Sequence, residues 1–133
     1  MRTVFADTFF FLALLDSKER QHMNALAASS DETLQIVTSE WVLTEFADAY
    51  ADPKDRPDFL AIYRALEKNL RVRIIPASSR LFQQGIDFYS KRLDKKWSLT
   101  DCISFVIMHD ERIPEALTGD RDFEQAGYTA LLK

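Results

Sequence analysis

Short apolar runs alternate with longer amphipathic segments along this sequence. The short runs lack regular alternation with polar residues and stop at a polar residue or a proline, a pattern typical of strands buried on both faces. In the longer segments apolar residues recur every three or four positions, which predicts helices with one buried side. The predicted strands cover residues 3–6, 34–38, 72–75 and 115–118, followed by an edge strand at 128–132.

Capping residues and prolines set the ends of the predicted helices. Thr38 or Ser39 is expected to cap the third helix, and Ser78 or Ser79 the fifth. The predicted buried side of the fifth helix consists of Leu81, Phe82, Ile86, Phe88, Tyr89 and Leu93. The predicted helices cover residues 9–15, 18–28, 40–51, 57–70, 79–93 and 98–111, with a short helical turn at 120–126.

Strands and helices that alternate in this way imply a parallel sheet covered by helices on both faces. No repeat, linker or low-complexity tract divides the chain, and 133 residues match the usual size of one domain. We therefore expect a single α/β domain over residues 1–133. Sites in such folds form outside the carboxyl ends of the strands, so residues that directly follow the strands are the first candidates for function.

Composition and charge narrow the class of protein. Hydrophobic residues make up 47% and charged residues 29%, which is ordinary for a globular chain. The single cysteine, Cys102, cannot form an intrachain disulfide, so a reducing, cytoplasmic setting is expected. The apolar start is interrupted by Asp7 and is too short to span a bilayer, so no membrane partner is expected. The net charge of -4 argues against binding of polyanions by bulk charge alone.

Five carboxylates stand where chemistry is expected. Asp7 follows the first strand, and Asp120 and Asp122 follow the fourth. Glu45 lies among apolar residues of the third helix, which favours an inward position over an exposed one, and Asp101 lies in the motif SLTD that opens the sixth helix. As a structural alternative, Asp7, Asp101 and Asp120 could each serve to cap a helix. Because parallel strands bring their carboxyl ends to one edge, we expect these acids to converge.

Carboxylates packed together in a low-dielectric cleft repel one another unless a cation lies among them. Acids without a nearby cysteine or histidine cluster select hard ions that prefer oxygen, Mg²⁺ or Mn²⁺, over Zn²⁺. The two histidines, His22 and His109, lie in separate helices with no shared spacing and are expected to be structural or exposed. The sequence therefore predicts a magnesium or manganese site.

At these residues the sequence resembles the PIN-domain ribonucleases, and among them the VapC-like toxins of toxin–antitoxin modules. The motifs that carry the resemblance are Asp7-Thr8 after the first strand, VLTE ending at Glu45, SLTD ending at Asp101, and TGDRDF at 118–123. Their order and spacing extend over the whole chain. Each motif is weak by itself, and the ordered combination is fairly specific.

The resemblance implies a three-layer α/β/α fold with a short, mostly parallel central sheet. It also implies metal-dependent hydrolysis of RNA phosphodiester bonds, with Mg²⁺ or Mn²⁺ as the cofactor. The implied partners are an RNA substrate, a cognate antitoxin protein and a second copy of the chain in a homodimer. The implied catalytic residues are Asp7, Glu45, Asp101 and Asp120, which also bind the metal together with Asp122. Phe9 departs from the small polar residue that many relatives carry at this position.

Several individual roles stay open at the level of sequence. Thr8 or Thr118 could position a water molecule, or each could bond only to backbone. Arg121 could reach a phosphate or pair with an acid. One basic segment either contacts RNA or interacts only with its helix end and with solvent. This segment consists of Lys91, Arg92, Lys95 and Lys96.

Two other classes of function fit parts of the pattern. A receiver-type signalling module also gathers aspartates at this rim, but it requires paired acids after the first strand and a lysine after a late strand, which the sequence lacks. A catalytically idle interaction domain would keep the fold and bind a partner through surplus aromatic residues of the fourth and fifth helices. These aromatic residues are Phe59, Tyr63, Phe82, Phe88 and Tyr89.

Overall fold

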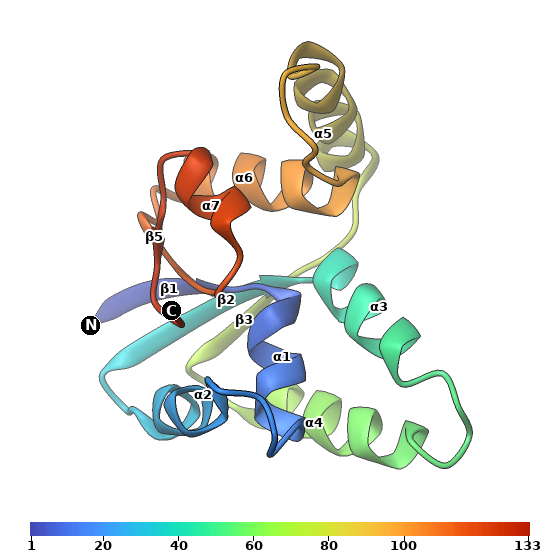
Figure 1. The fold of residues 1–133 in the computed structure, drawn as a ribbon, viewed down its shortest axis with the longest axis vertical. Coiled ribbons are helices and arrows are strands. Elements are labelled where there is room, and N and C mark those ends of the chain that lie inside the picture. Colours follow the sequence, from blue (N-terminus) through green and yellow to red (C-terminus); the bar gives the residue numbers. More distant parts are fainter.

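The computed structural model describes all residues from Met1 to Lys133 and arranges five strands and seven helices around one sheet (Figure 1). Every predicted strand is present, and the order of elements is the predicted one. The strands are β1 (Arg2–Ala6), β2 (Leu34–Ser39), β3 (Val72–Ile75), β4 (Glu115–Leu117) and β5 (Thr129–Ala130). The helices are α1 (Thr8–Leu15), α2 (His22–Ser30), α3 (Glu40–Ala49), α4 (Arg56–Lys68), α5 (Ser79–Lys91), α6 (Leu99–Glu111) and α7 (Arg121–Gln125).

All strand pairs in the sheet are parallel, and the strand order is β3-β2-β1-β4-β5. The chain first builds outward from β1 through β2 to β3 and then crosses to the other side of β1 to add β4 and β5. The switch point therefore lies between β1 and β4, where ligands of open α/β sheets bind. Receiver-type modules have the order 2-1-3-4-5, so this topology shows that the receiver hypothesis is wrong.

Helices cover both faces of the sheet, which confirms the three-layer α/β/α prediction. Figure 1 shows α1, α2 and α4 on one side of the sheet and α6 and α7 on the other, with α5 packed outside α6. In β1 the consecutive residues Val4, Phe5 and Ala6 are all fully buried. Successive strand residues point to opposite faces, so their burial shows that both faces of the central strand are packed. None of the helices has the length and apolar character needed to cross a membrane.

Helix α2 begins later than predicted, at His22 and not near residue 18. The carboxylate of Asp16 accepts a hydrogen bond of 2.9 Å from the Lys18 amide, and the carboxylate of Glu19 accepts one from the Gln21 amide. Such local bonds between a side chain and the backbone compete with helical hydrogen bonds. They hold this segment in turns that connect α1 to α2.

The prediction for the buried side of α5 is partly wrong. Leu81 is buried as expected, but Phe82, Tyr89 and Leu93 are 41%, 51% and 89% exposed. The reason is a close approach of α5 to α6 at Gly85, where any side chain would collide with Ile103. Close contact along this line leaves the neighbouring apolar stripe of α5, about 100° around the helix axis, exposed to solvent. The spacing of apolar residues in the sequence does not distinguish the two stripes, so it predicts that both are buried.

Candidate active site

The candidate site lies at the carboxyl ends of β1 and β4, next to the switch point of the sheet. Asp7 directly follows β1, and its amide donates a 3.4 Å hydrogen bond to the carbonyl of Leu117, the last residue of β4. Asp7 is buried, with 5% of its surface exposed, and Thr118 beyond β4 is fully buried. Asp7 occupies the N-cap position of α1, but its side chain makes no capping bond. The capping alternative for Asp7 is therefore wrong, and its carboxylate is directed elsewhere.

A chain of three hydrogen bonds connects the acids at this edge. The Thr118 hydroxyl donates to Oδ2 of Asp7 at 2.9 Å, and the same Thr118 oxygen accepts from the Asp120 amide at 3.1 Å. Oδ1 of Asp120 in turn accepts from the Asp122 amide at 2.9 Å, which caps α7. The expected turn and helix start after β4 is thus confirmed. This turn fixes the position of Asp120, so a structural role and a role at the site are compatible.

Glycine is required in the middle of this turn. A Cβ at position 119 would lie 2.6 Å from Cζ of Phe9 and 2.7 Å from the backbone oxygen of Leu132. Phe9 is the residue at which the sequence departs from the resemblance, and its ring fills the space beside Gly119. The aromatic ring therefore packs against the turn that carries Asp120.

Asp101 takes part both in a cap and in the acidic cluster. The Ser98 hydroxyl accepts a 3.0 Å bond from the Asp101 amide, and Oδ2 of Asp101 accepts a 3.3 Å bond from the Ser98 amide. This reciprocal pair is the predicted capping box of α6. The two interpretations of Asp101 were therefore not exclusive, because the cap uses one carboxylate oxygen.

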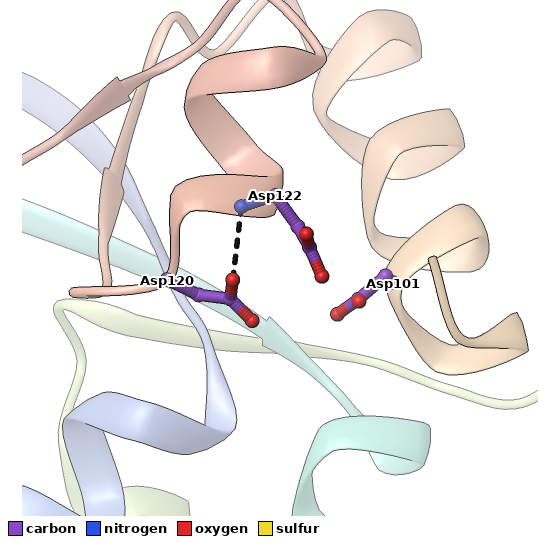
Figure 2. Close-up of side chains that lie close together, drawn as sticks. All are labelled: Asp101, Asp120 and Asp122. Atoms are coloured by element: carbon purple, nitrogen blue, oxygen red, sulfur yellow. Dashed lines mark hydrogen bonds between the residues drawn. The ribbon is translucent and has the colours of Figure 1, made fainter. Parts of the chain in front are cut away.

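Three carboxylates meet in front of α6 and α7. Asp101, Asp120 and Asp122 each place one oxygen within 4.8 Å of the others. Figure 2 shows these side chains directed toward one another from α6, from the turn after β4 and from α7. Asp101 and Asp120 each have one oxygen anchored by an amide, which leaves the second oxygen for a ligand. No ion pair of the structure involves any of these three acids. This donor set of hard oxygens fits a divalent cation such as Mg²⁺.

Asp7 and Glu45 stand at the border of this cluster. Neither belongs to the group of acids within 4.8 Å, but the negative charge of Asp7 acts on Asp101, and that of Glu45 acts on Asp7. Glu45 accepts a 2.5 Å hydrogen bond from the hydroxyl of Thr8. The inward position expected for Glu45 is wrong, because the residue is exposed. Helix α3 buries Val42, Leu43 and Phe46, and Glu45 lies at the edge of that face.

Burial and mutual repulsion raise the pKa values of Asp7, Asp101 and Asp122. Burial is the main cause for Asp7, whose pKa rises from 3.8 to about 6, with the charges of Glu45 and Asp120 adding to it against the Thr118 hydrogen bond. For Asp101, burial first and then the charges of Asp7, Asp120 and Asp122 raise the pKa from 3.8 to about 7. Burial and the Asp120 charge also raise the pKa of Asp122, and the Asp101 side chain and, more weakly, the Lys95 ammonium oppose them.

The histidines, Arg121 and the two threonines singled out in the sequence differ in their contacts. His22 holds the Ala13 carbonyl through Nδ1 at 2.7 Å, and the side chain of His109 is 86% exposed, so both histidines are structural or exposed as predicted. Arg121 is exposed and forms no ion pair. The hydroxyls of Thr8 and Thr118 bond to carboxylates and not only to backbone, a role that was not predicted. The signal was present, because each threonine lies within two residues of a site aspartate in the motifs DT and TGD.

Fold and site together define a class: an open parallel α/β/α protein with a cluster of carboxylates at the switch point of its sheet. The PIN domain profile matches residues 4–127. The chain belongs to the PIN domain family, as its motifs indicated.

Comparisons with known proteins agree with this assignment. The chain is 25% identical over 125 residues to the 23S rRNA-specific endonuclease VapC20 of Mycobacterium tuberculosis, covering 94% of this chain and 95% of that protein. The crystal structure of VapC20, described as a toxin that cleaves the sarcin-ricin loop, superposes with a TM-score of 0.83 at 25% identity, over 98% of this chain and 99% of that one.

Two more distant structures share the fold. VapBC2 of Rickettsia felis, bound to a DNA fragment from its promoter, matches with a TM-score of 0.68 at 13% identity and 96% coverage of both chains. FitAcB of Neisseria gonorrhoeae matches with a TM-score of 0.64 at 15% identity, over 96% of this chain and 95% of that chain. At this level of identity they support the fold alone.

We expect Thr118→Val to destabilise the protein by about 1–3 kcal/mol, because it leaves the buried Asp7 carboxylate and the Asp120 amide without their shared partner. Thr118→Ser keeps the hydroxyl and should recover most of this loss. Urea denaturation of the three proteins measures the effect. Equal stability of the valine and serine variants would show that the hydroxyl does not hold the site.

A second prediction concerns pH. Raised folded-state pKa values mean that the folded protein binds more protons than the unfolded chain between pH ~4 and ~7, so these acids lower stability as pH rises through this range. In the presence of a chelator, Asp101→Asn should therefore flatten the pH profile and be more stable than wild type at pH 8 by roughly 1–3 kcal/mol. Asparagine keeps the oxygen that accepts from Ser98.

The matched control for the pH profile is Asp48→Asn, at an exposed position of α3. Its stability should follow that of wild type from pH 5 to pH 8, within about 0.5 kcal/mol. Thermal or urea unfolding across this pH range provides the measurement. Parallel profiles for Asp101→Asn and wild type would contradict the assigned repulsion.

Proposed function

We propose that this protein is a divalent-metal-dependent endoribonuclease that hydrolyses RNA phosphodiester bonds and acts as the toxin of a toxin–antitoxin pair. The observation that carries the proposal is the convergence of Asp101, Asp120 and Asp122 without any cationic side chain paired to them. Membership of the PIN domain family and the similarity to VapC20, named as a 23S rRNA-specific endonuclease, support RNA as the substrate.

The residues assigned to the ion are Asp7, Asp101 and Asp120, with Asp122 as a further ligand and Glu45 at the border. A divalent ion bound there would lower the pKa of a coordinated water and neutralise charge on the phosphoryl oxygens. Side chains of the protein hold the carboxylates in position. Thr118 fixes the orientation of the Asp7 carboxylate, and Thr8 does the same for Glu45.

Mg²⁺ and Mn²⁺ are the proposed ions because the donor set contains oxygen alone. Zn²⁺ sites draw mainly on cysteine and histidine, and neither histidine approaches the cluster, since His22 bonds to the Ala13 carbonyl and His109 is exposed. Cys102 follows Asp101 in α6 but is buried in the core, with 1% of its surface exposed. A hard cation with oxygen ligands therefore fits the site better than a soft one.

The decisive experiment is cleavage of a structured RNA fragment by the purified protein. We expect discrete cleavage in Mg²⁺ or Mn²⁺, none in a chelator, and recovery when the ion is added back. Asp101→Asn and Asp120→Asn should each lower the rate by at least about 100-fold, since loss of a residue that only orients a metal ligand already costs up to that factor. Asp48→Asn should cleave like wild type. Cleavage that persists in the chelator would refute the metal-dependent mechanism.

The assembly is also proposed. Large apolar side chains remain exposed on α4 and α5, among them Leu60 and Phe82 at 38% and 41%. Exposed apolar groups of this kind favour contact with another protein surface. The proposed contacts are a second copy of this chain and a cognate antitoxin.

Light scattering on the purified protein should give a mass of two chains of 15.4 kDa. Co-expression with the small protein from the adjoining reading frame should give a stable complex in which RNA cleavage is inhibited. A monomer that neither binds nor is inhibited by that protein would contradict the assembly, while leaving the nuclease assignment to the cleavage experiment.

A further inference from the structure

A basic cavity of about 290 Å³ opens beside the loop that joins α5 to α6. Arg92, Lys95 and Lys96 supply its charge. The rest of the lining is mainly apolar and consists of Tyr89, Leu93, Trp97 and Cys102. These basic residues take no part in the acidic site. Because they surround one cavity, a negatively charged ligand is favoured there.

Two of the three positive charges are not neutralised within the protein. Arg92 pairs with Asp94 at 3.0 Å, and its guanidinium lies 4.7 Å from the ring centroid of Trp97. Lys95 and Lys96 form no ion pair. In a chain of net charge -4 this cavity is thus a local exception. It provides attraction for a polyanion that the protein as a whole would repel.

The cavity and the acidic cluster border adjacent faces of the same helical turn. Cys102, at the cavity, directly follows Asp101, at the cluster, in the first turn of α6. Consecutive residues of a helix point about 100° apart, so the two sites occupy adjacent faces of this turn. The Lys95 ammonium also acts electrostatically on the Asp122 carboxylate. The cavity is therefore a neighbouring region for a polymer held at the acids.

The loop is held in place rather than loosely attached. The indole Nε1 of Trp97 donates a 3.2 Å hydrogen bond to Gln125, at the end of α7. The same ring packs edge-on against Phe105 of α6 with a centroid distance of 5.1 Å. These contacts fix the lysines relative to α6 and α7, the two helices that carry Asp101 and Asp122.

We propose that this cavity binds a nucleotide of the RNA substrate next to the scissile phosphate. Lys95 and Lys96 contact its phosphodiester oxygens, and the half-exposed ring of Tyr89 stacks on its base. The proposal rests on the ribonuclease function and extends it to a substrate-binding subsite. RNA is favoured over an acidic protein segment because the cavity adjoins the acidic cluster, where the polyanionic backbone is to be cleaved.

The test compares the double variant Lys95→Ala/Lys96→Ala with a matched control, Lys54→Ala/Lys68→Ala. Lys54 and Lys68 are exposed, unpaired and located before and at the end of α4, across the sheet from α6 (Figure 1). We expect the first variant to raise KM for RNA about tenfold with kcat nearly unchanged. It should also reduce the salt dependence of binding, by about 0.7 in the log–log slope for each lost phosphate contact. The control should match wild type in both.

Tyr89 provides an independent arm of the same experiment. Tyr89→Ala should raise KM about tenfold, and Tyr89→Phe should restore it, because phenylalanine keeps the stacking face. A structural role for the tyrosine would instead lower the thermal stability of the alanine variant in proportion to its loss of binding. Wild-type stability together with a raised KM supports the subsite.

Other outcomes overturn the proposal in distinguishable ways. Unchanged KM and salt slope in the lysine variant, with wild-type cleavage intact, would remove the subsite and leave the nuclease function. A loss of kcat alone would show that Lys95 acts on the acidic cluster and not on RNA. Loss of antitoxin affinity with unchanged KM for RNA would assign the cavity to the protein partner. A wild-type protein that neither binds nor cleaves RNA would refute the function and the subsite together.

Discussion

Repulsion among carboxylates that the fold forces together is the constraint on which this structure depends. Asp101, Asp120 and Asp122 place oxygens within 4.8 Å of one another, and the buried Asp7 adds its charge to theirs. A protein can relieve such repulsion with a paired arginine or lysine, by protonation or with a bound cation. No arginine or lysine pairs with these acids. Burial and the neighbouring charges raise the pKa values of Asp7 and Asp101, so a proton and a cation compete for these carboxylates.

Hydrogen bonds hold three of these acids in place and occupy one oxygen of each carboxylate, in Asp7, Asp101 and Asp120. Thr118 lies at the centre, because its hydroxyl donates to Asp7 and accepts from the Asp120 amide. The helix caps of α6 and α7 fix the carboxylates of Asp101 and Asp120 in the same manner. Capping and metal binding are often treated as competing explanations for an aspartate at a helix start. In this site they coexist, since a carboxylate has two oxygens and the cap requires one.

The basic cavity explains how an acidic protein can act on an acidic polymer. The acidic cluster alone would repel RNA, and a divalent ion reverses the local field only at the ion itself. Lys95 and Lys96 extend the attraction along the path of the backbone, while their loop stays anchored to α7 through Trp97. We thus propose that catalysis and attraction of the substrate occur in two neighbouring regions at the α6 N-terminus. The first region is acidic and the second is basic.

The sequence by itself determined the class of fold and the order of the strands along the chain, because buried strands, caps and motifs leave local signals. It also singled out the acids that are proposed for the site. Only the tertiary structure decided which acids meet: Asp122 joins the central group, whereas Glu45 is exposed and linked through Thr8. It also decided which stripe of α5 is buried, through the close approach at Gly85. These outcomes depend on distances between elements remote in sequence, and periodicity along one helix carries no information about the helix packed against it.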